Sequence, residues 1–532
     1  MTTRRAEGAL ITRRALGALA AAAVAVRSMD ARAEGQTFVS GWGLPGNLDP
    51  HQIFDVPMQT VMFNAYDGLY RYENDPPEIV PWLAESHTVS GDGLTWEFKL
   101  RSGVKFHDGS DLTADDVVYS FHRVLALRLA PAGAFLPVLK AENVTAPDKL
   151  TVRFVLSKPY APFFAAIPIV SVVNERVIRP HEKDGDWGKS WLASNGAGSG
   201  AYKIVPQGYR PLEQLDLEIF DGHFMGWEDN KNPVRKIAMR PTAETSTRIL
   251  ALLNGTMDWT DTNFPADQVD RVNASKIAHV EKNTVMRTFL IRMQNQRPPF
   301  DNLNARKAFA HAFNYMGFIT DILGGYATRD GLPMPDTLWG CPKNVAIYDY
   351  DLAKAKQYAA KALAEGAPMK RPIELHIQSE NDIAVQAAQL FQSDLAEVGI
   401  NLKVVPDTWA NMITNVVRPE TCPDMWVHWI STYFVDPENW VGQMYDSQFH
   451  GTWKASSYYK NDAVDALLRQ ARSTLAQQDR VPLYEKAITQ IMADCPDVWI
   501  YNSMQLQGIN NRVKGRRFCT VGQGCEMRWI SI

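Results

Sequence analysis

A helix that leads directly into a strand, within residues 381–404, constrains the fold of this chain more than any other segment. The apolar face of the helix is formed by Ile383, Ala387, Leu390, Phe391, Leu395 and Val398. Asn381 or Asp382 is placed to cap its start, and Gly399 ends it. Ile400–Val404 then alternates between apolar and polar residues, which is typical of a half-buried strand. A helix followed at once by a strand predicts crossover connections and a mixed α/β sheet.

The rest of the chain carries the same two kinds of pattern. Its 532 residues are 45% hydrophobic and 21% charged, enough for a large core and for about three or four domains, or fewer large lobes. Residues 76 to about 190 are rich in strands. Alternation predicts strands at 36–40, 94–100, 151–156 and 201–205. Helical periodicity predicts helices at 58–70, 114–124, 245–254 and 302–316.

The first 33 residues have the pattern of a signal peptide. Arg13 and Arg14 precede the apolar run Ala15–Val26, and Ala31-Arg32-Ala33 forms a small-x-small cleavage site. Twelve apolar residues are too few to span a bilayer, which needs about twenty. The sequence therefore predicts export to the periplasm with cleavage after Ala33. The twin arginines indicate the Tat route, and the Sec route stays open.

Charge and cysteine content exclude several classes of function. The signal segment holds six arginines against Glu7 and Asp30, so its removal lowers the net charge from −4 to −8. An acidic chain without basic blocks is not expected to bind nucleic acid. The five cysteines show no CxxC pair and no zinc spacing, and none is expected to be catalytic. Cys519 and Cys525 are close enough in sequence to form a disulfide in the periplasm.

Residues 100–120 form a strand end, a turn and a capped helix. His107-Asp108-Gly109 supplies the turn, and Thr113 with Asp116 forms a capping box for the helix from Ala114. This segment closely resembles the signature of extracytoplasmic solute-binding proteins of family 5, the peptide/nickel or dipeptide/oligopeptide-binding type. Five more segments resemble this family in the same order along the chain: Gly198–Tyr202, Leu253–Asp258, Asn295–Asp301, Tyr348–Ala355 and Asp436–Trp440.

The resemblance implies an α/β, two-lobed periplasmic-binding-protein type II fold (cluster C) with an extra subdomain in lobe I. The ligand is expected in the cleft between the lobes. The implied divisions are a signal peptide at 1–33, lobe I at 34–292 with a subdomain at about 76–195, lobe II at 293–497, and a return to lobe I at 498–532. The hinge strands are expected near Thr288–Met293 and Val498–Asn502.

The resemblance also implies which segments line the ligand cleft. These are the loop after the first strand, the segment around Trp409, and the strand and turn at 429–436. The expected ligand-binding residues are Trp42, Gly43, Leu44, Trp409, Trp429, Thr432, Tyr433 and Asp436.

One position departs from the peptide-binding members of the family. These members carry an Asp four residues before the Pro of the Asp-Pro turn, where it pairs with the ammonium group of the ligand. Counting back from Pro437 gives Tyr433, and counting forward from Trp429 gives Thr432, so neither register supplies a carboxylate. A buried ammonium would then lose its charge-assisted bond. Asp436 is expected to cap the turn, and replaces the missing carboxylate only if the loop folds back.

Alternation divides the aromatic residues near the turn between two faces. Trp429, Ser431 and Tyr433 share one face, and the residues between them share the other. Because one face must belong to the core, we expect the Trp429/Tyr433 face to contact the ligand. His450 lies where nickel-binding relatives have a histidine, but no second His or Cys is nearby at ligand spacing, so no metal or cofactor is predicted.

The predicted function is that of the periplasmic substrate-binding component of an ABC importer. It would capture a peptide or peptide-like solute by lobe closure and deliver it, as a monomer, to an inner-membrane permease. Alternatives are a non-peptide ligand (an opine, a glycoside or a metal chelate such as nickel) or a receptor or chaperone role. An enzyme is not predicted, because the chain lacks Gly-x-Ser-x-Gly, His-Glu-x-x-His, Walker and Rossmann motifs.

Overall fold

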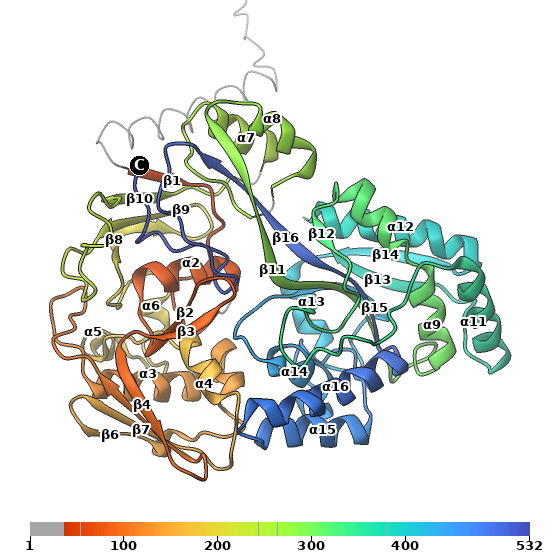
Figure 1. Cartoon of the computed structure of the whole chain (residues 1–532), viewed down its shortest axis with the longest axis horizontal. Helices are drawn as coiled ribbons and strands as arrows, with labels where there is room; N and C mark the ends of the chain where they lie inside the picture. Colours follow the sequence, from red (N-terminus) through yellow and green to blue (C-terminus); the bar gives the residue numbers. More distant parts are fainter. Residues whose placement is uncertain (1–36, 54, 243, 263, 380) are drawn as a thin grey trace, which may run out of the picture.

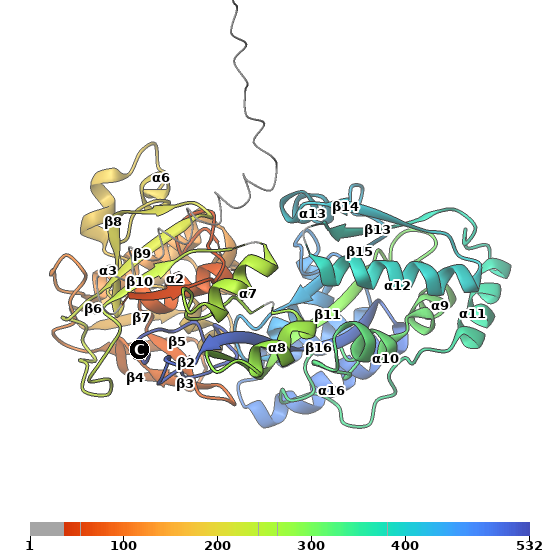
Figure 2. The ribbon, with the colours of Figure 1, turned by 90° about the horizontal axis from the view of Figure 1, so that it is seen from above.

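A computed structural model describes residues 37–53, 55–242, 244–262, 264–379 and 381–532. The predicted signal peptide at 1–33 lies outside these residues. Two lobes lie side by side, and two long strands run between them (Figures 1 and 2). Lobe I holds the elements from β1 to α8 and the segment after β16. Lobe II holds the elements from α9 to α16.

The two long strands are β11 (Ala278–Met293) and β16 (Asp497–Asn510). They pair antiparallel from Ala278↔Asn510 to Arg292↔Asp497, with a register shift between Thr284 and Thr288. The predicted hinge segments lie within these strands. The predicted lobe boundaries fall next to Met293 and Asp497, and stay predictions.

Lobe I is built on a four-stranded sheet in the order β1-β10-β9-β8, in which β1 and β10 are parallel. The sheet packs with α2 around a core that includes Phe38, Trp42 and Trp259. Trp259 also forms a bridge to Ile509, so the end of β16 joins this lobe. The elements are β1 (Thr37–Ser40), α2 (Val56–Ala65), α5 (Glu175–Ile178), α6 (Lys189–Leu192), β8 (Tyr202–Arg210), β9 (Gln214–Ile219), β10 (Lys236–Met239), α7 (Thr245–Leu253) and α8 (Val269–Asn273).

A second sheet of lobe I, in the order β4-β5-β7-β6, packs against α3. Three alternate side chains of β5, Trp96, Phe98 and Leu100, are buried, as the pattern at 94–100 predicts. The capping box of Thr113 and Asp116 starts α3, also as predicted. The elements are β2 (Tyr70–Glu73), β3 (Glu78–Pro81), β4 (Ala84–Val89), β5 (Thr95–Leu100), α3 (Ala114–Leu127), β6 (Val144–Asp148), β7 (Thr151–Val155) and α4 (Phe163–Ala166).

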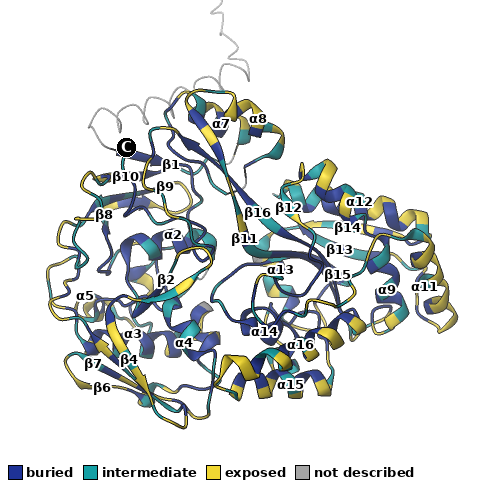
Figure 3. Ribbon diagram, in the orientation of Figure 1, coloured by how far each residue is buried: buried dark blue, intermediate teal, exposed yellow. Residues whose placement is uncertain are grey.

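Lobe II has a six-stranded mixed sheet in the order β12-β16-β11-β15-β13-β14. Its outer helices expose one face each (Figure 3). The predicted helix–strand unit is confirmed: Asn381 caps α12, Gly399 ends it at φ 84°, and β13 lies parallel to β14. The elements are α9 (Leu303–Ala312), α10 (Tyr315–Gly317), β12 (Ala327–Thr328), α11 (Leu352–Ala364), β13 (Ile373–Gln378), α12 (Asp382–Val398), β14 (Leu402–Asp407), α13 (Trp409–Val416), β15 (Met425–Ile430), α14 (Val441–Tyr445), α15 (Asp462–Ser473) and α16 (Gln477–Asp494).

Two predicted helices are shorter than expected. The helix predicted at 58–70 ends at Ala65, because Tyr66 is extended and Tyr70 already belongs to β2. The helix predicted at 302–316 ends at Ala312, where Phe313 turns into the core in an extended conformation. In the described part of the chain, every helix is too short or too polar to cross a membrane.

Candidate functional site

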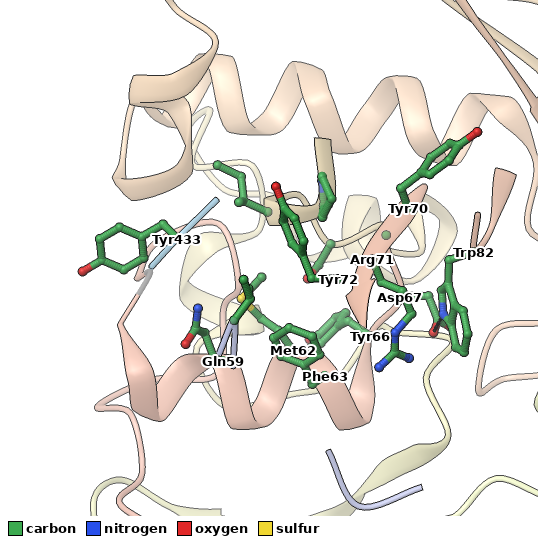
Figure 4. A pocket seen from close by; sticks show the side chains of 15 residues that line it. Gln59, Met62, Phe63, Tyr66, Asp67, Tyr70, Arg71, Tyr72, Trp82 and Tyr433 are labelled. Atoms are coloured by element: carbon green, nitrogen blue, oxygen red, sulfur yellow. Dashed lines mark hydrogen bonds between the residues drawn. The ribbon is translucent and has the colours of Figure 1, made fainter. Parts of the chain in front are cut away.

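A pocket lies where lobe II meets α2 and β2 of lobe I (Figure 4). Tyr433 supplies the wall from lobe II, and Figure 4 shows it at the same end of the pocket as Gln59 of α2. The other labelled side chains all belong to lobe I: Met62, Phe63, Tyr66, Asp67, Tyr70, Arg71, Tyr72 and Trp82. Tyr433 therefore lies at the contact between the two lobes.

The loop after β15 is held by both lobes. Thr432 Oγ1 donates a hydrogen bond to the carbonyl oxygen of Met286 in β11. The backbone N–H of Val435 donates to Tyr72 Oη in β2. Phe434 is 2% exposed and packs in the hydrophobic cluster of the second sheet of lobe I. These contacts fix the position of Tyr433 between the lobes.

Asp55 starts the α2 wall of this site. Its carboxylate caps α2 by accepting a hydrogen bond from the Met58 backbone N–H at 2.8 Å. Burial raises the pKa of Asp55, against the effect of that hydrogen bond. Burial also raises the pKa of Tyr433, and the nearby Asp55 carboxylate raises it further. Asp55, the N-cap of α2, lies within electrostatic range of Tyr433, and Gln59 in the second turn of the helix lines the same pocket as Tyr433.

Arg287 lies in β11 within the register shift between Thr284 and Thr288. Its guanidinium carbon is 5.3 Å from the ring centre of Trp429. Burial lowers the pKa of Arg287, and the hydroxyl groups of Tyr501 and Tyr433 oppose this effect. The sheet therefore places a half-buried cation beside Trp429 and Tyr433.

A second cation, Lys454, also lies beside Tyr433. Its Nζ is 4.8 Å from the centre of the Tyr433 ring. It donates hydrogen bonds to the side chain and carbonyl oxygen of Asn439, each at 3.1 Å, and to Gln443 Oε1 at 2.6 Å. Burial lowers the pKa of Lys454 to about 7.

The loop after β1 contributes mainly to the core in this conformation. Trp42 is 2% exposed and packs against Trp259, with ring centres 6.1 Å apart. Leu44 is buried in the same cluster, whereas Gly43 is half-buried. None of these three residues lines the pocket at Tyr433. Their predicted ligand contacts stay predictions.

Trp409 and Trp429 lie in separate aromatic groups. Trp409 begins α13 and stacks on His428, with ring centres 5.4 Å apart and an angle of 10° between the rings. Trp429 packs on Phe289 of β11, with ring centres 4.4 Å apart. The two tryptophans are both half-buried. Their predicted contacts with a ligand are not tested by this arrangement.

Residues 429–434 differ in burial largely as the two-face argument expects. Ile430, Thr432 and Phe434 are buried, whereas Trp429 and Tyr433 are half-buried. Ser431 is buried as well, because β15 ends at Ile430 and strict alternation ends with it. The structure thus leaves the Trp429/Tyr433 pair as the more accessible one.

Asp436 pairs with an arginine of lobe II. Its two carboxylate oxygens accept hydrogen bonds from Arg480 at 2.7 and 2.8 Å. The same carboxylate accepts a hydrogen bond from the Glu438 backbone N–H and caps the turn, as predicted. A carboxylate held in this way is already satisfied, so Asp436 does not fold back to replace the missing Asp in this conformation.

His450 forms a hydrogen bond within the fold, and the five cysteines are not joined by disulfides. His450 Nε2 donates to the Tyr459 carbonyl oxygen at 2.9 Å. Within the described ranges, no group of three or more His, Cys, Asp or Glu side chains is arranged to hold a metal ion. All five cysteines have free thiols, so the predicted pair Cys519 and Cys525 is not bonded in this structure.

Three residues near Tyr433 were not predicted from the sequence: Asp55, Arg287 and Lys454. Asp55 precedes Val56-Pro57, a helix-start signal of the same kind as Thr113 provides. Arg287 is a charged residue within an apolar strand pattern, and this was the available signal of a special position. Lys454 has no distinguishing sequence signal, because only the fold brings it to Tyr433.

The family model described as "Bacterial extracellular solute-binding proteins, family 5 Middle" matches residues 78–451. The chain is 29% identical over 478 residues to "Probable D,D-dipeptide-binding periplasmic protein DdpA" of Escherichia coli K12, covering 88% of this chain and 89% of that protein. It resembles the periplasmic binding protein DppA of Helicobacter pylori, solved in complex with peptide STSA. That match has 26% identity, a TM-score of 0.82, and covers 93% and 97% of the two chains.

The fold is also that of the oligopeptide-binding protein AppA of Bacillus subtilis, with a TM-score of 0.81 at 19% identity, covering 93% of this chain and 98% of that chain. These similarities cover 88–93% of the chain. The family match covers more than half of the sequence. The chain belongs to the bacterial extracellular solute-binding proteins of family 5.

Proposed function

We propose that this protein is the periplasmic substrate-binding component of an ABC importer. It captures a peptide or a peptide-like solute between its lobes and delivers it to an inner-membrane permease. The observation that carries this proposal is the position of Tyr433, a lobe II residue in a pocket whose other walls belong to lobe I. A ligand that contacts both lobes favours the closed form through its higher affinity for that form.

The relatives support a peptide as the ligand class. The names of the two relatives at 26% and 29% identity refer to a peptide and a D,D-dipeptide. Thr432 and Tyr433, at the position of the missing Asp, favour a second candidate, a non-peptide solute without an ammonium group. The protein binds its ligand without transforming it, and it acts as a monomer without nucleic acid.

Thermal unfolding with candidate ligands tests the proposal. The probes are Ala-Ala, D-Ala-D-Ala, Ser-Thr-Ser-Ala and agropinic acid, an opine whose nitrogen lies in a lactam and carries no charge. A cognate ligand at a hundred times its Kd should stabilise the fold by about 2.7 kcal/mol. Mass spectrometry of the recovered ligand should show it unchanged. Failure of all peptides with success of the opine selects the second candidate, and failure of every probe contradicts both.

Export is tested on the full chain. The periplasmic form should begin at Glu34, as measured by intact mass. Replacement of Arg13 and Arg14 by lysine should retain the precursor in the cytoplasm if export uses Tat. Undiminished export of that variant would select the Sec route.

A further inference from the structure

Arg287 has hydrogen-bonding capacity that none of the described residues uses. Its guanidinium has no hydrogen-bond or ion-pair partner among the residues that the structure describes, and its Nε is shielded from solvent. Most buried polar groups in proteins are paired, and a buried charged donor without a partner is costly. A free donor that persists beside the contact between the lobes indicates that its partner arrives with the solute.

The surroundings of Arg287 favour an anionic partner. Lys454 lies over the ring of Tyr433, and Tyr433 lies within electrostatic range of Arg287. Burial lowers the pKa of His428, and the charges of Arg292, Arg287 and Lys454 lower it further. Arg292 pairs with Asp497, and Glu438 lies within electrostatic range of Lys454. Among these cations Arg287 is therefore the one without a carboxylate partner in the described part of the chain, and Thr432 and Tyr433 supply none.

The contact between Arg287 and Trp429 is compatible with a planar anion as the partner. The guanidinium carbon lies over the Trp429 ring, 5.3 Å from the ring centre. Stacking on a ring covers a face but leaves the N–H groups at the edge available. This edge matches the two oxygen atoms of a carboxylate, which accept two parallel hydrogen bonds.

We propose that Arg287 binds a carboxylate group of the solute through two parallel N–H···O hydrogen bonds. This inference rests on the proposed function and narrows its ligand class to solutes with a carboxylate. The charged group that orients the solute is then a cation of the hinge strand β11. Arg287 would thus orient the solute in this protein, whereas the Asp before the Asp-Pro turn is expected to do so in the peptide-binding members of the family. The carboxylate belongs either to the C-terminus of a peptide or to a side chain.

Calorimetric titration of the whole mature protein tests the assignment. The probes are Ala-Ala and D-Ala-D-Ala as free acids, the C-terminal amides of both, and Ala-Glu amide. The wild-type protein should bind the better free acid about 10- to 100-fold more tightly than its amide. Arg287→Gln should weaken binding of the acid by a similar factor and leave binding of the amide nearly unchanged. Tight binding of Ala-Glu amide would assign the carboxylate to a side chain.

A variant on the same strand provides the control. Lys282 also lies in β11, over the ring of Tyr326, at 4.5 Å. Lys282→Gln removes the same charge and a similar ring contact outside the cleft, so it should keep the wild-type preference for the acid. Arg287→Lys should restore part of this preference, because it keeps the charge and loses the fork geometry.

The possible results distinguish failure of the role of Arg287 from failure of the proposed function. Equal affinity of the wild-type protein for acid and amide, or an unchanged preference in Arg287→Gln, would overturn the role of Arg287 while the importer function stands. Failure of every acid and amide to bind would overturn the role of Arg287 together with the assignment of a peptide ligand. Arg287→Gln should fold normally because the guanidinium forms no hydrogen bond or ion pair with the described residues, and circular dichroism would establish this for each variant.

Discussion

The backbone N–H of Val435 donates a hydrogen bond of 3.0 Å to the hydroxyl oxygen of Tyr72, and the two residues belong to different lobes. The same hydroxyl group donates to the carbonyl oxygen of Ala165 at 2.7 Å. Tyr72 thus connects the loop of lobe II to α4 of lobe I. The link favours the conformation in which the lobes are in contact.

Tyr72→Phe should weaken ligand binding. The substitution removes the hydroxyl group between the lobes, a loss of about 0.5–1.5 kcal/mol, equivalent to a roughly 2- to 13-fold rise in Kd. Titration with the best ligand of the panel measures it. The control is Tyr209→Phe, since Tyr209 Oη donates to the Pro45 carbonyl oxygen within lobe I at 2.8 Å. Equal effects of both substitutions on Kd would refute a role for Tyr72 in closure.

Phe434→Ala should open the protein in the absence of ligand. Phe434 belongs to lobe II by sequence but is buried with Phe163 in lobe I. Loss of this contact removes about 1.5–3 kcal/mol of side-chain burial. We expect a larger radius of gyration in X-ray scattering. Phe434→Leu, which retains most of the volume, should stay close to wild type. An unchanged radius in Phe434→Ala would contradict the prediction.

Asp55→Ala should destabilise the ligand-free protein. It removes the N-cap of α2, which costs about 1 kcal/mol. Asp55→Asn keeps an oxygen that accepts the hydrogen bond from Met58, so its midpoint in urea should stay near that of wild type. Unfolding in urea compares the two variants. If Asp55→Ala is as stable as Asp55→Asn, the cap contributes nothing measurable.

Asp330 should make stability depend on pH. It is 7% exposed, and neither carboxylate oxygen has a hydrogen-bond partner among the described residues. Burial, together with Asp336, raises its pKa from 3.8 to about 7. The folded state therefore binds more protons than the unfolded state between these values. The contribution of Asp330 to stability is complete below pH 3.8 and is lost as the pH rises through about 7.

Asp330→Asn should remove the loss of folding stability that wild type shows as the pH rises. Its stability relative to wild type should increase from about pH 4 to about pH 7 and then level off, as measured by urea unfolding at several pH values. Asp336→Asn removes the neighbouring charge, so it should lower the pKa of Asp330 and narrow the pH range over which stability is lost. A constant difference between Asp330→Asn and wild type at all pH values would disprove the assignment.

Local signals predicted the elements of the fold best. The cap at Asn381, the end at Gly399 and the capping box of Thr113 depend on residues within one helical turn, so the sequence alone was sufficient. The ends of α2 and α9 were not predictable in this way, because Tyr66 and Phe313 leave the helix for contacts made by the whole fold. Periodicity describes one element at a time and carries no information about its neighbours.

The candidate site was predictable only in part. Tyr433 and the capping role of Asp436 followed from a motif and from alternation. The contacts of Phe434 with lobe I and of Arg287 with Trp429 join segments that are far apart in the sequence. The spacing of residues in the sequence does not predict such contacts, because they depend on how the lobes meet and on the register shift in β11.

The pairing of Ile509 with Trp259 sets the order in which the protein can mature during synthesis. Nearly the whole polypeptide is synthesised before Ile509 is added. Lobe I therefore cannot complete its contacts at Trp259 until the residues of lobe II have been synthesised. Any nascent chain that stops before β16 lacks a strand in the six-stranded sheet and the bridge at Trp259. Only a chain that includes β16 can therefore form the native six-stranded sheet and the bridge at Trp259.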